Sequence, residues 1–117
     1  MKSRIMYIEP KGFGDKNPLF PGKIGRVTFS ESGKTIYYKE QTFSPKKGKR
    51  GYYLEDGTGE TYWICTPKRN GTDRKDPGVI EIDDDVREEY WIDIRKRPES
   101  AHRVVFRSFG PGPKPTD

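Results

Sequence analysis

Apolar and polar residues alternate in several short runs, and this pattern predicts β-strands rather than long helices. Residues 24–29 and 35–38 alternate with a period of two on either side of a turn that contains Gly33. Residues 52–54 and 61–65 flank a second turn. Each pair is typical of an antiparallel hairpin. Further short strands are expected at residues 5–8 and 79–82, and a last strand is allowed at residues 103–107.

The segments between these runs are rich in glycine, proline and lysine, which predicts surface loops. They span residues 9–22, 44–51 and 67–78. The end of the chain, residues 110–117, is so rich in glycine and proline that it cannot join a β-ladder. We therefore expect a single domain over residues 1–109, followed by a flexible tail.

One segment, at about residues 84–96, carries the pattern of a helix. Acidic residues gather at its start and basic residues at its end, which suits the charge distribution of the helix dipole. Either Asp83 or Asp84 is expected to cap the first turn, because aspartate is a preferred N-cap residue. Pro98 is expected to end the helix.

This helix should lie on a small β-sheet. Val86, Tyr90 and Ile94 recur every four residues and so share one apolar face. The fold class is therefore mainly β: a small bent antiparallel sheet, or an SH3-like or OB-like barrel of five or six strands, with one C-terminal helix. Ten residues should supply most of the core: Val27, Phe29, Ile36, Tyr38, Tyr62, Ile64, Ile80, Val86, Tyr90 and Ile94.

The composition predicts a small domain with a thin core. Of the 117 residues, 30% are apolar and 35% are charged, which by itself favours disorder. Seven Tyr, six Phe and two Trp oppose that tendency, because aromatic side chains bury on the order of 150–250 Å² each. We therefore expect an ordered domain whose core is largely aromatic.

The chain is basic outside one acidic segment. Its net charge is +5, yet residues 79–93 contain seven acids and one base, a local charge of −6, which leaves +11 on the rest. A basic surface attracts anionic partners through long-range electrostatics, or it serves solubility alone. The acidic segment coincides with the start of the predicted helix.

The residues that most often carry catalysis are scarce. Cys65 is the only cysteine, so no internal disulfide forms, and its strand-like neighbours predict a buried, unreactive thiol. His102 is the only histidine, which excludes a multi-histidine metal site. With neither a secretory signal nor an apolar run long enough to span a membrane, a reducing cytoplasm is the expected compartment.

No cofactor or metal site is predicted. The three acids at residues 83–85 offer oxygen ligands for a hard cation, but helix starts attract acids without any metal. The chain has no glycine-rich loop that ends in Lys-Ser or Lys-Thr, which a phosphate-binding loop would need. We therefore expect a binding module and not an enzyme.

Several of these runs occur together in a known group of proteins. They are residues 3–9, 24–30, 32–38, 59–64 and 79–91. On these runs the chain resembles a family of small uncharacterised bacterial proteins over roughly residues 3–98, and some members carry the automatic name deoxyxylulose-phosphate synthase. The resemblance implies no established activity. That synthase is a far longer thiamine-diphosphate enzyme with a Gly-Asp-Gly motif that is missing from this chain, so we reject the name.

Basic loops beside aromatic strands suggest a site for single-stranded RNA or DNA. Such sites combine cations for the phosphates with flat rings on which bases stack. The alternative is that the aromatic residues only form the core. The predicted nucleic-acid-binding residues are Lys46, Lys47, Lys49, Arg50, Tyr53, Trp63, Lys68, Arg69, Arg74 and Lys75.

A second hypothesis uses the acidic helix. Exposed acids at its start and a free sheet edge would suit a protein–protein adaptor or inhibitor, whereas an ordinary solvated helix face would explain the same acids. The residues of this alternative are Asp84, Asp85 and Glu88. The sequence leaves the oligomeric state open.

Overall fold

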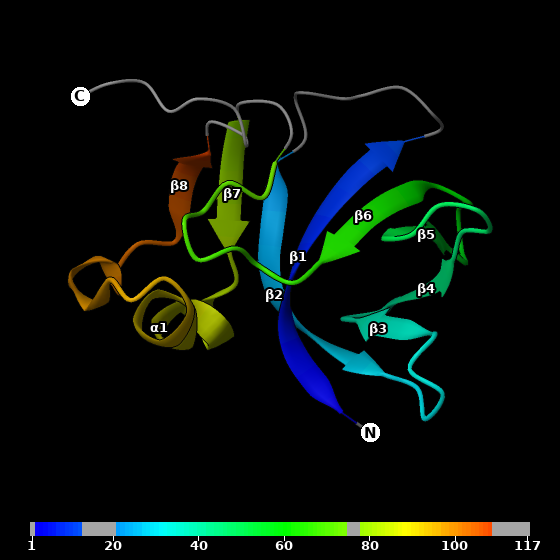
Figure 1. Ribbon diagram of the computed structural model, residues 1–117, viewed down its shortest axis with the longest axis horizontal. Coiled ribbons are helices and arrows are strands. Elements are labelled where there is room, and N and C mark those ends of the chain that lie inside the picture. The colour runs from blue at the N-terminus through cyan, green and yellow to red at the C-terminus, as the bar shows by residue number, and fades with distance from the viewer. Residues whose placement is uncertain (1, 13–20, 75–77, 109–117) are drawn as a thin grey trace.

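The N-terminal strand β1 pairs with two neighbours at once, and this double pairing closes six antiparallel strands into a barrel (Figure 1). The structure, a computed structural model, describes residues 2–12, 21–74 and 78–108. The barrel strands are β1 (Ser3–Gly12), β2 (Gly22–Phe29), β3 (Ile36–Tyr38), β4 (Gln41–Pro45), β5 (Tyr52–Glu55) and β6 (Thr61–Cys65). The predicted small barrel and both predicted hairpins, β2–β3 and β5–β6, are therefore confirmed.

Two further strands extend the sheet beyond β2. β7 (Gly78–Ile82) runs parallel to β2, and β8 (Val105–Ser108) runs antiparallel to β7. In Figure 1 both stand to the left of the barrel, above the helix. The strand expected at residues 79–82 and the last strand are thus present. The predicted tail, residues 110–117, lies outside the described residues.

The C-terminal helix is shorter and less regular than predicted. It begins as a 3₁₀ turn, continues as a single α-helical turn and ends as a π-helical turn; these parts are η1 (Asp84–Val86), α1 (Arg87–Glu89) and η2 (Tyr90–Ile94). Lys96 adopts a left-handed φ of 56°, which stops the helix before the expected residue 96. A short 3₁₀ turn, η3 (Pro98–Ser100), follows. No helix in the described ranges is long and apolar enough to cross a membrane.

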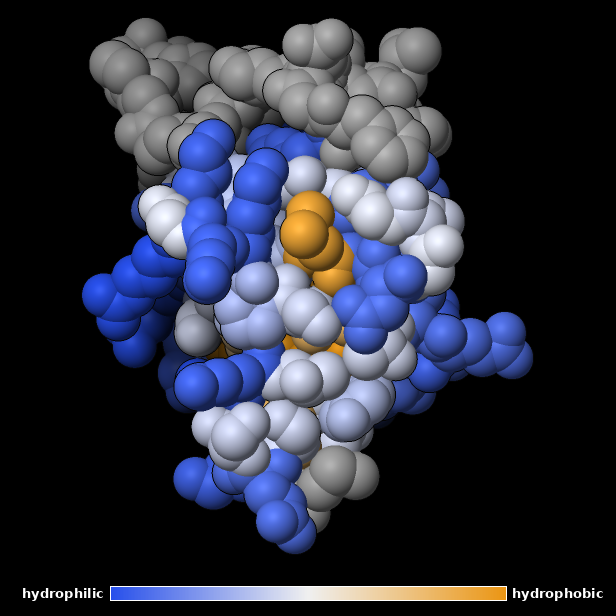
Figure 2. Space-filling model, turned by 90° about the vertical axis from the view of Figure 1, so that its right-hand side faces the viewer, coloured by the Kyte–Doolittle hydropathy of each residue, from blue (hydrophilic) through white to orange (hydrophobic). Residues whose placement is uncertain are grey.

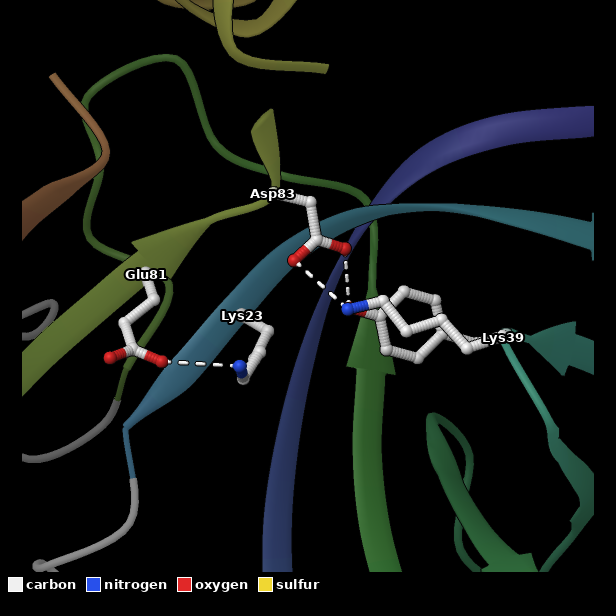
Figure 3. A network of polar contacts seen from close by, with 5 residues as sticks. Lys23, Lys39, Glu81 and Asp83 are labelled. Carbon is white, nitrogen blue, oxygen red and sulfur yellow. Dashed lines mark hydrogen bonds and ion pairs between the residues drawn. The ribbon is translucent and has the colours of Figure 1, made fainter. Parts of the chain in front are cut away.

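Asp83 does not cap this helix with its side chain, contrary to the prediction, and neither does Asp84. The Asp83 carboxylate instead accepts hydrogen bonds from the Tyr38 hydroxyl, 2.5 Å away, and from the Lys39 ammonium at 3.5 Å. Figure 3 shows Asp83 pointing toward Lys39, with the ion pair between Lys23 and Glu81 beside it. These contacts connect the end of β7 to the barrel. The Asp83 carboxylate bonds to Tyr38 instead of capping the helix because the Tyr38 side chain is buried and its hydroxyl needs a hydrogen-bond partner.

The prediction was wrong about two strands. β1 continues to Gly12, although residues 9–22 were expected to form a loop, and the strand β4 was not predicted. β4 follows β3 after a two-residue turn at Lys39 and Glu40, where Lys39 has a φ of 54°. Neither residue is a usual turn former, so the chain gives no local signal for this reversal.

The sheet buries apolar residues on both of its faces. Inside the barrel lie Met6, Ile8, Val27, Ile36, Tyr38, Phe43 and Ile64. Outside it, beneath the helix and β8, a second core holds Ile5, Tyr7, Ile24, Ile80, Ile82, Val86, Tyr90, Trp91 and Phe106. β1 serves both cores, which explains its continuous apolar run. The ten predicted core residues belong to these cores or pack against them, with Phe29, Tyr62 and Ile94 only partly buried.

Candidate nucleic-acid interface

The two predicted basic loops extend from the same end of the β5–β6 hairpin. The turn at residues 46–51 leads into β5, and the loop at residues 66–74 leaves β6. β5 and β6 are antiparallel, with Tyr52 level with Trp63, so both loops lie at the same end of the pair. The amide of Ile64 also donates to the carbonyl of Gly51, at 3.0 Å. The hairpin therefore places two cation-bearing loops that are distant in sequence at the same end of the strand pair.

Most cations of these loops reach solvent. Lys47, Lys49, Arg50, Lys68 and Arg69 are exposed, and Lys46 is half-buried. The barrel side of the molecule in Figure 2 is largely hydrophilic, with a small hydrophobic area near its centre. A surface of this kind suits a charged ligand better than an apolar one.

Two aromatic rings and a cation form a cluster on the outer face of the hairpin. Tyr52 and Trp63 pack edge to face with ring centroids 5.0 Å apart, and the Lys49 ammonium lies 5.6 Å from the Tyr52 centroid. Both rings are half-buried, so part of each stays open to solvent. Gly51, with a φ of 86°, makes room for the indole: an added Cβ would lie 2.8 Å from Trp63. We call Lys49, Tyr52 and Trp63 the outer-face cluster.

Tyr53, predicted as a stacking ring, does not belong to this cluster. It pairs with Tyr62 across the hairpin and packs against the core inside the barrel. Burial raises the pKa of the Tyr53 hydroxyl. Because successive strand residues point to opposite faces, Tyr53 and Trp63 cannot contact the same ligand surface. Tyr52, and not Tyr53, lies beside Trp63. The alternation of residues 52–54 together with the cross-strand register could have identified Tyr52 as the second ring.

Arg74 is also misplaced in the predicted site. Its side chain is only 3% exposed. The guanidinium lies against the backbone of β7, where a Cβ added to Gly78 would be 2.6 Å from the Arg74 Nε. A phosphate at the surface is therefore out of its reach. Lys75, the last predicted contact, lies outside the described residues.

A buried carboxylate shapes the loop that carries Lys68 and Arg69. The Asp73 Oδ1 accepts a hydrogen bond from the Lys68 amide at 2.7 Å, which closes the loop on itself. Asp73 is 5% exposed, and burial raises its pKa to about 6. Gly71 packs closely against Arg95 at the end of the helix: a Cβ added to Gly71 would lie 2.6 Å from the Arg95 Nη1. The loop is thus held from inside while its cations face outward.

An acid beside the outer-face cluster already has partners. Glu9 lies level with Trp63 on the neighbouring strand β1. It is buried, accepts a hydrogen bond from the Tyr7 hydroxyl and forms an ion pair with Lys11. The ion pair with Lys11 offsets its charge, which reduces its repulsion of an anionic ligand at Trp63.

The acids of the alternative hypothesis are exposed at the start of the helix. Asp84, Asp85 and Glu88 all face solvent. Asp84 forms an ion pair with Arg87 at 3.2 Å. These three acids have the exposure that an adaptor would need. No partner is shown, so the adaptor hypothesis stays a prediction.

Cys65 and His102 do not form a site together. Burial raises the pKa of the Cys65 thiol to about 11, so it stays protonated at neutral pH. His102 is exposed in the turn after η3. Among the described residues, no group of three or more His, Cys, Asp or Glu side chains is arranged to hold a metal ion.

Comparisons of the chain with protein-family models, curated proteins and solved structures found no match. The resemblance inferred from residues 3–98 therefore stays a prediction. The functional assignment rests on the geometry of the chain itself.

Proposed function

We propose that this protein binds single-stranded RNA or DNA on the outer face of the β5–β6 hairpin. One observation carries the proposal: the outer-face cluster lies at the end of the β5–β6 pair from which both basic loops extend. Half-buried rings are rigid platforms for bases, and base stacking on aromatic side chains is worth about 1–3 kcal/mol per base. The protein acts as a binding module, without catalysis or a cofactor.

Each group in the site takes a separate role. Trp63 and Tyr52 stack bases, and Lys49 contacts the phosphate beside them. Arg50, Lys68 and Arg69 neutralise neighbouring phosphates along the strand. Contacts to phosphates carry no base specificity, so we expect broad preference for single strands over duplexes. The lone thiol fits a cytoplasmic setting, which we propose as the compartment.

The test measures the affinity of the full chain for fluorescein-labelled oligouridylate and oligothymidylate by fluorescence anisotropy. Trp63→Leu should weaken binding about tenfold or more, because a stacking platform is lost. The matched control is Tyr37→Leu, since Tyr37 is an exposed ring (38%) on β3, outside the two basic loops. Its affinity should equal that of the wild type.

Salt provides a second, independent measure. The logarithm of the affinity should fall linearly with the logarithm of the salt concentration, because binding releases counterions from the phosphates. Replacing Lys46, Lys47, Lys49 and Arg50 with Glu should abolish binding. Equal affinities for Trp63→Leu and Tyr37→Leu, together with no dependence on salt, would refute the proposal.

A further inference from the structure

Within the described residues, the sheet has an open edge on β8. Closure of β1 on β2 removes the free edges from the barrel strands, while β8 ends the strand order. Among the described residues, β8 pairs only with β7. Figure 1 shows β8 at the far left, on the opposite side of the barrel from β5. The edge is therefore separate from the proposed nucleic-acid interface.

The register shows which backbone groups of β8 point outward. Ile82 donates to the Val104 carbonyl at 2.7 Å, so this pair is hydrogen-bonded. Hydrogen-bonded and non-hydrogen-bonded pairs alternate along an antiparallel ladder. The backbone amide and carbonyl of Phe106 therefore point toward β7. Those of Val105 and Arg107 point away from the sheet. Two donors and two acceptors are available to an added strand.

Exposed valines gather around this edge. Val105 is 41% exposed, Val104 is 50% exposed, and Val79, diagonal to Val105 on the neighbouring strand, is 39% exposed. They are three of the five large hydrophobic residues that are exposed in the described part of the chain. Exposed apolar side chains beside unpaired backbone groups are what a strand-adding partner contacts.

Charge selects the partner. Arg107 lies on the same face as Val105, and Arg103 precedes the strand; both are exposed and neither forms an ion pair within the described ranges. Pairing of two β8 strands would bring two Arg107 side chains to one edge, and like charges across strands are destabilising. An acidic segment meets no such penalty.

We propose that β8 receives an extended peptide segment of a protein partner, which adds a strand to the sheet and places an acidic residue opposite Arg107. A β-branched residue two positions away faces Val105. Backbone hydrogen bonds to Val105 and Arg107 supply the pairing, and the valines and the arginine select the sequence. The protein thereby carries two faces, one for nucleic acid and one for a protein.

The probe is a capped peptide with valine and glutamate in turn at every second position and threonine between them, so that one face of the strand carries both valine and glutamate. It is titrated into the isotope-labelled full chain. Amide resonances of Val105 and Arg107 should shift, and their hydrogen exchange should slow, because both amides become hydrogen-bonded. The same peptide with lysine in place of glutamate should bind about tenfold more weakly or worse, since it meets Arg107 with a like charge. Resonances of Tyr52 and Trp63 should not change.

Two variants test the edge in different ways. Val105→Pro removes the outward amide while sparing the pairing with β7, since proline is tolerated on edge strands where its nitrogen faces solvent. It should bind the glutamate peptide at least about tenfold more weakly than the matched control Val105→Thr. Arg107→Glu should reverse the preference toward the lysine peptide, and it leaves every backbone hydrogen bond in place.

Unchanged exchange at Val105 and Arg107, or equal binding of both peptides to the wild type and to Arg107→Glu, would overturn the proposal. Sedimentation of the free chain gives a further check. A dimer that Val105→Pro converts into a monomer would assign the edge to a second copy of the chain and would likewise overturn it.

Discussion

In two clusters of the described residues a cation lies against packed aromatic rings, and the clusters differ in how much of each ring is buried. Beneath the helix, Tyr90, Trp91 and Phe106 are at most 6% exposed. The Arg95 guanidinium lies 4.9 Å from the Trp91 centroid and 4.8 Å from the Phe106 centroid, and it donates to the Tyr90 hydroxyl at 3.0 Å. Almost no ring surface is left there for a ligand.

The outer-face cluster uses similar chemistry without that enclosure. Tyr52 and Trp63 are half-buried, and Lys49 approaches Tyr52 from the exposed turn. A ring that is fully enclosed contributes its area to folding, whereas a half-buried ring keeps area for a partner. The comparison shows that aromatic and basic residues do not define a binding surface until burial is known.

The largest expected effect is the loss of a ring from the enclosed cluster. Tyr90→Ala should lower the free energy of unfolding by about 3–5 kcal/mol, because it removes a fully buried aromatic side chain. Chemical denaturation of the variant measures this, with Tyr37→Ala as the exposed control, which should change stability by less than about 1 kcal/mol. Equal losses in the two variants would erase the contrast between enclosed and exposed rings.

The second expected effect is a change in the free energy of unfolding with pH. It comes from the carboxyl group of Asp73, which lies near Arg95. Its pKa rises from 3.8 to about 6 on burial, so the folded state holds a proton that the unfolded state releases. Stability contributed at this site should therefore fall as the pH rises from about 4 to about 6, by about 3 kcal/mol, and stay low above that range.

The variant Asp73→Asn separates this effect from the titration of other carboxyl groups. It keeps an acceptor for the Lys68 amide but cannot ionise. Denaturation at several pH values should show the wild type losing stability relative to the variant as the pH rises. A difference that stays constant from pH 4 to pH 7 would show that burial does not penalise the charged form.

A smaller effect is expected when the enclosed cation changes shape. Arg95→Lys keeps the charge but loses the flat group that stacks on the rings and the fork that reaches Tyr90, and it should cost about 1–2 kcal/mol. Arg97→Lys, at an exposed arginine of the same helix end, should change stability by less than about 0.5 kcal/mol. Thermal unfolding compares the two, and equal melting temperatures would contradict the enclosed geometry.

The smallest effect on stability is expected at the outer-face cluster. Lys49→Ala should leave the free energy of unfolding within about 0.5 kcal/mol of the wild type. It should nevertheless reduce the slope of nucleic-acid affinity against salt by about one, because one phosphate contact is lost. An unchanged slope would remove Lys49 from the proposed site. A large loss of stability would instead place it with the enclosed cluster.

The hairpins and the helix could be predicted from the chain because their signals are local. Alternation around Gly33 and around the turn at residues 55–60 marks two hairpins, and the interval between Val86 and Tyr90 marks the helix face. β4 escaped prediction because its turn, at Lys39 and Glu40, uses residues without turn preference.

The arrangement of the candidate site residues was predicted only in part, for a related reason. The basic loops on either side of the β5–β6 hairpin were predicted from local composition, and the register places both at the same end of the pair. The choice of Tyr53 over Tyr52, and the inclusion of Arg74, depended on which way each side chain points. Composition and spacing do not contain that information, because adjacent strand residues have opposite surroundings.

By itself, then, the sequence determined the β-rich class, the two hairpins, the place of the helix and the group of basic loops. Only the tertiary structure decided that β1 closes the barrel by pairing with both β2 and β6, that β7 joins β2 in parallel, and that β8 is left as the open edge. Hairpins form between neighbouring segments, whereas the β1–β6 and β2–β7 pairings join distant ones and depend on burying both faces of the sheet at once.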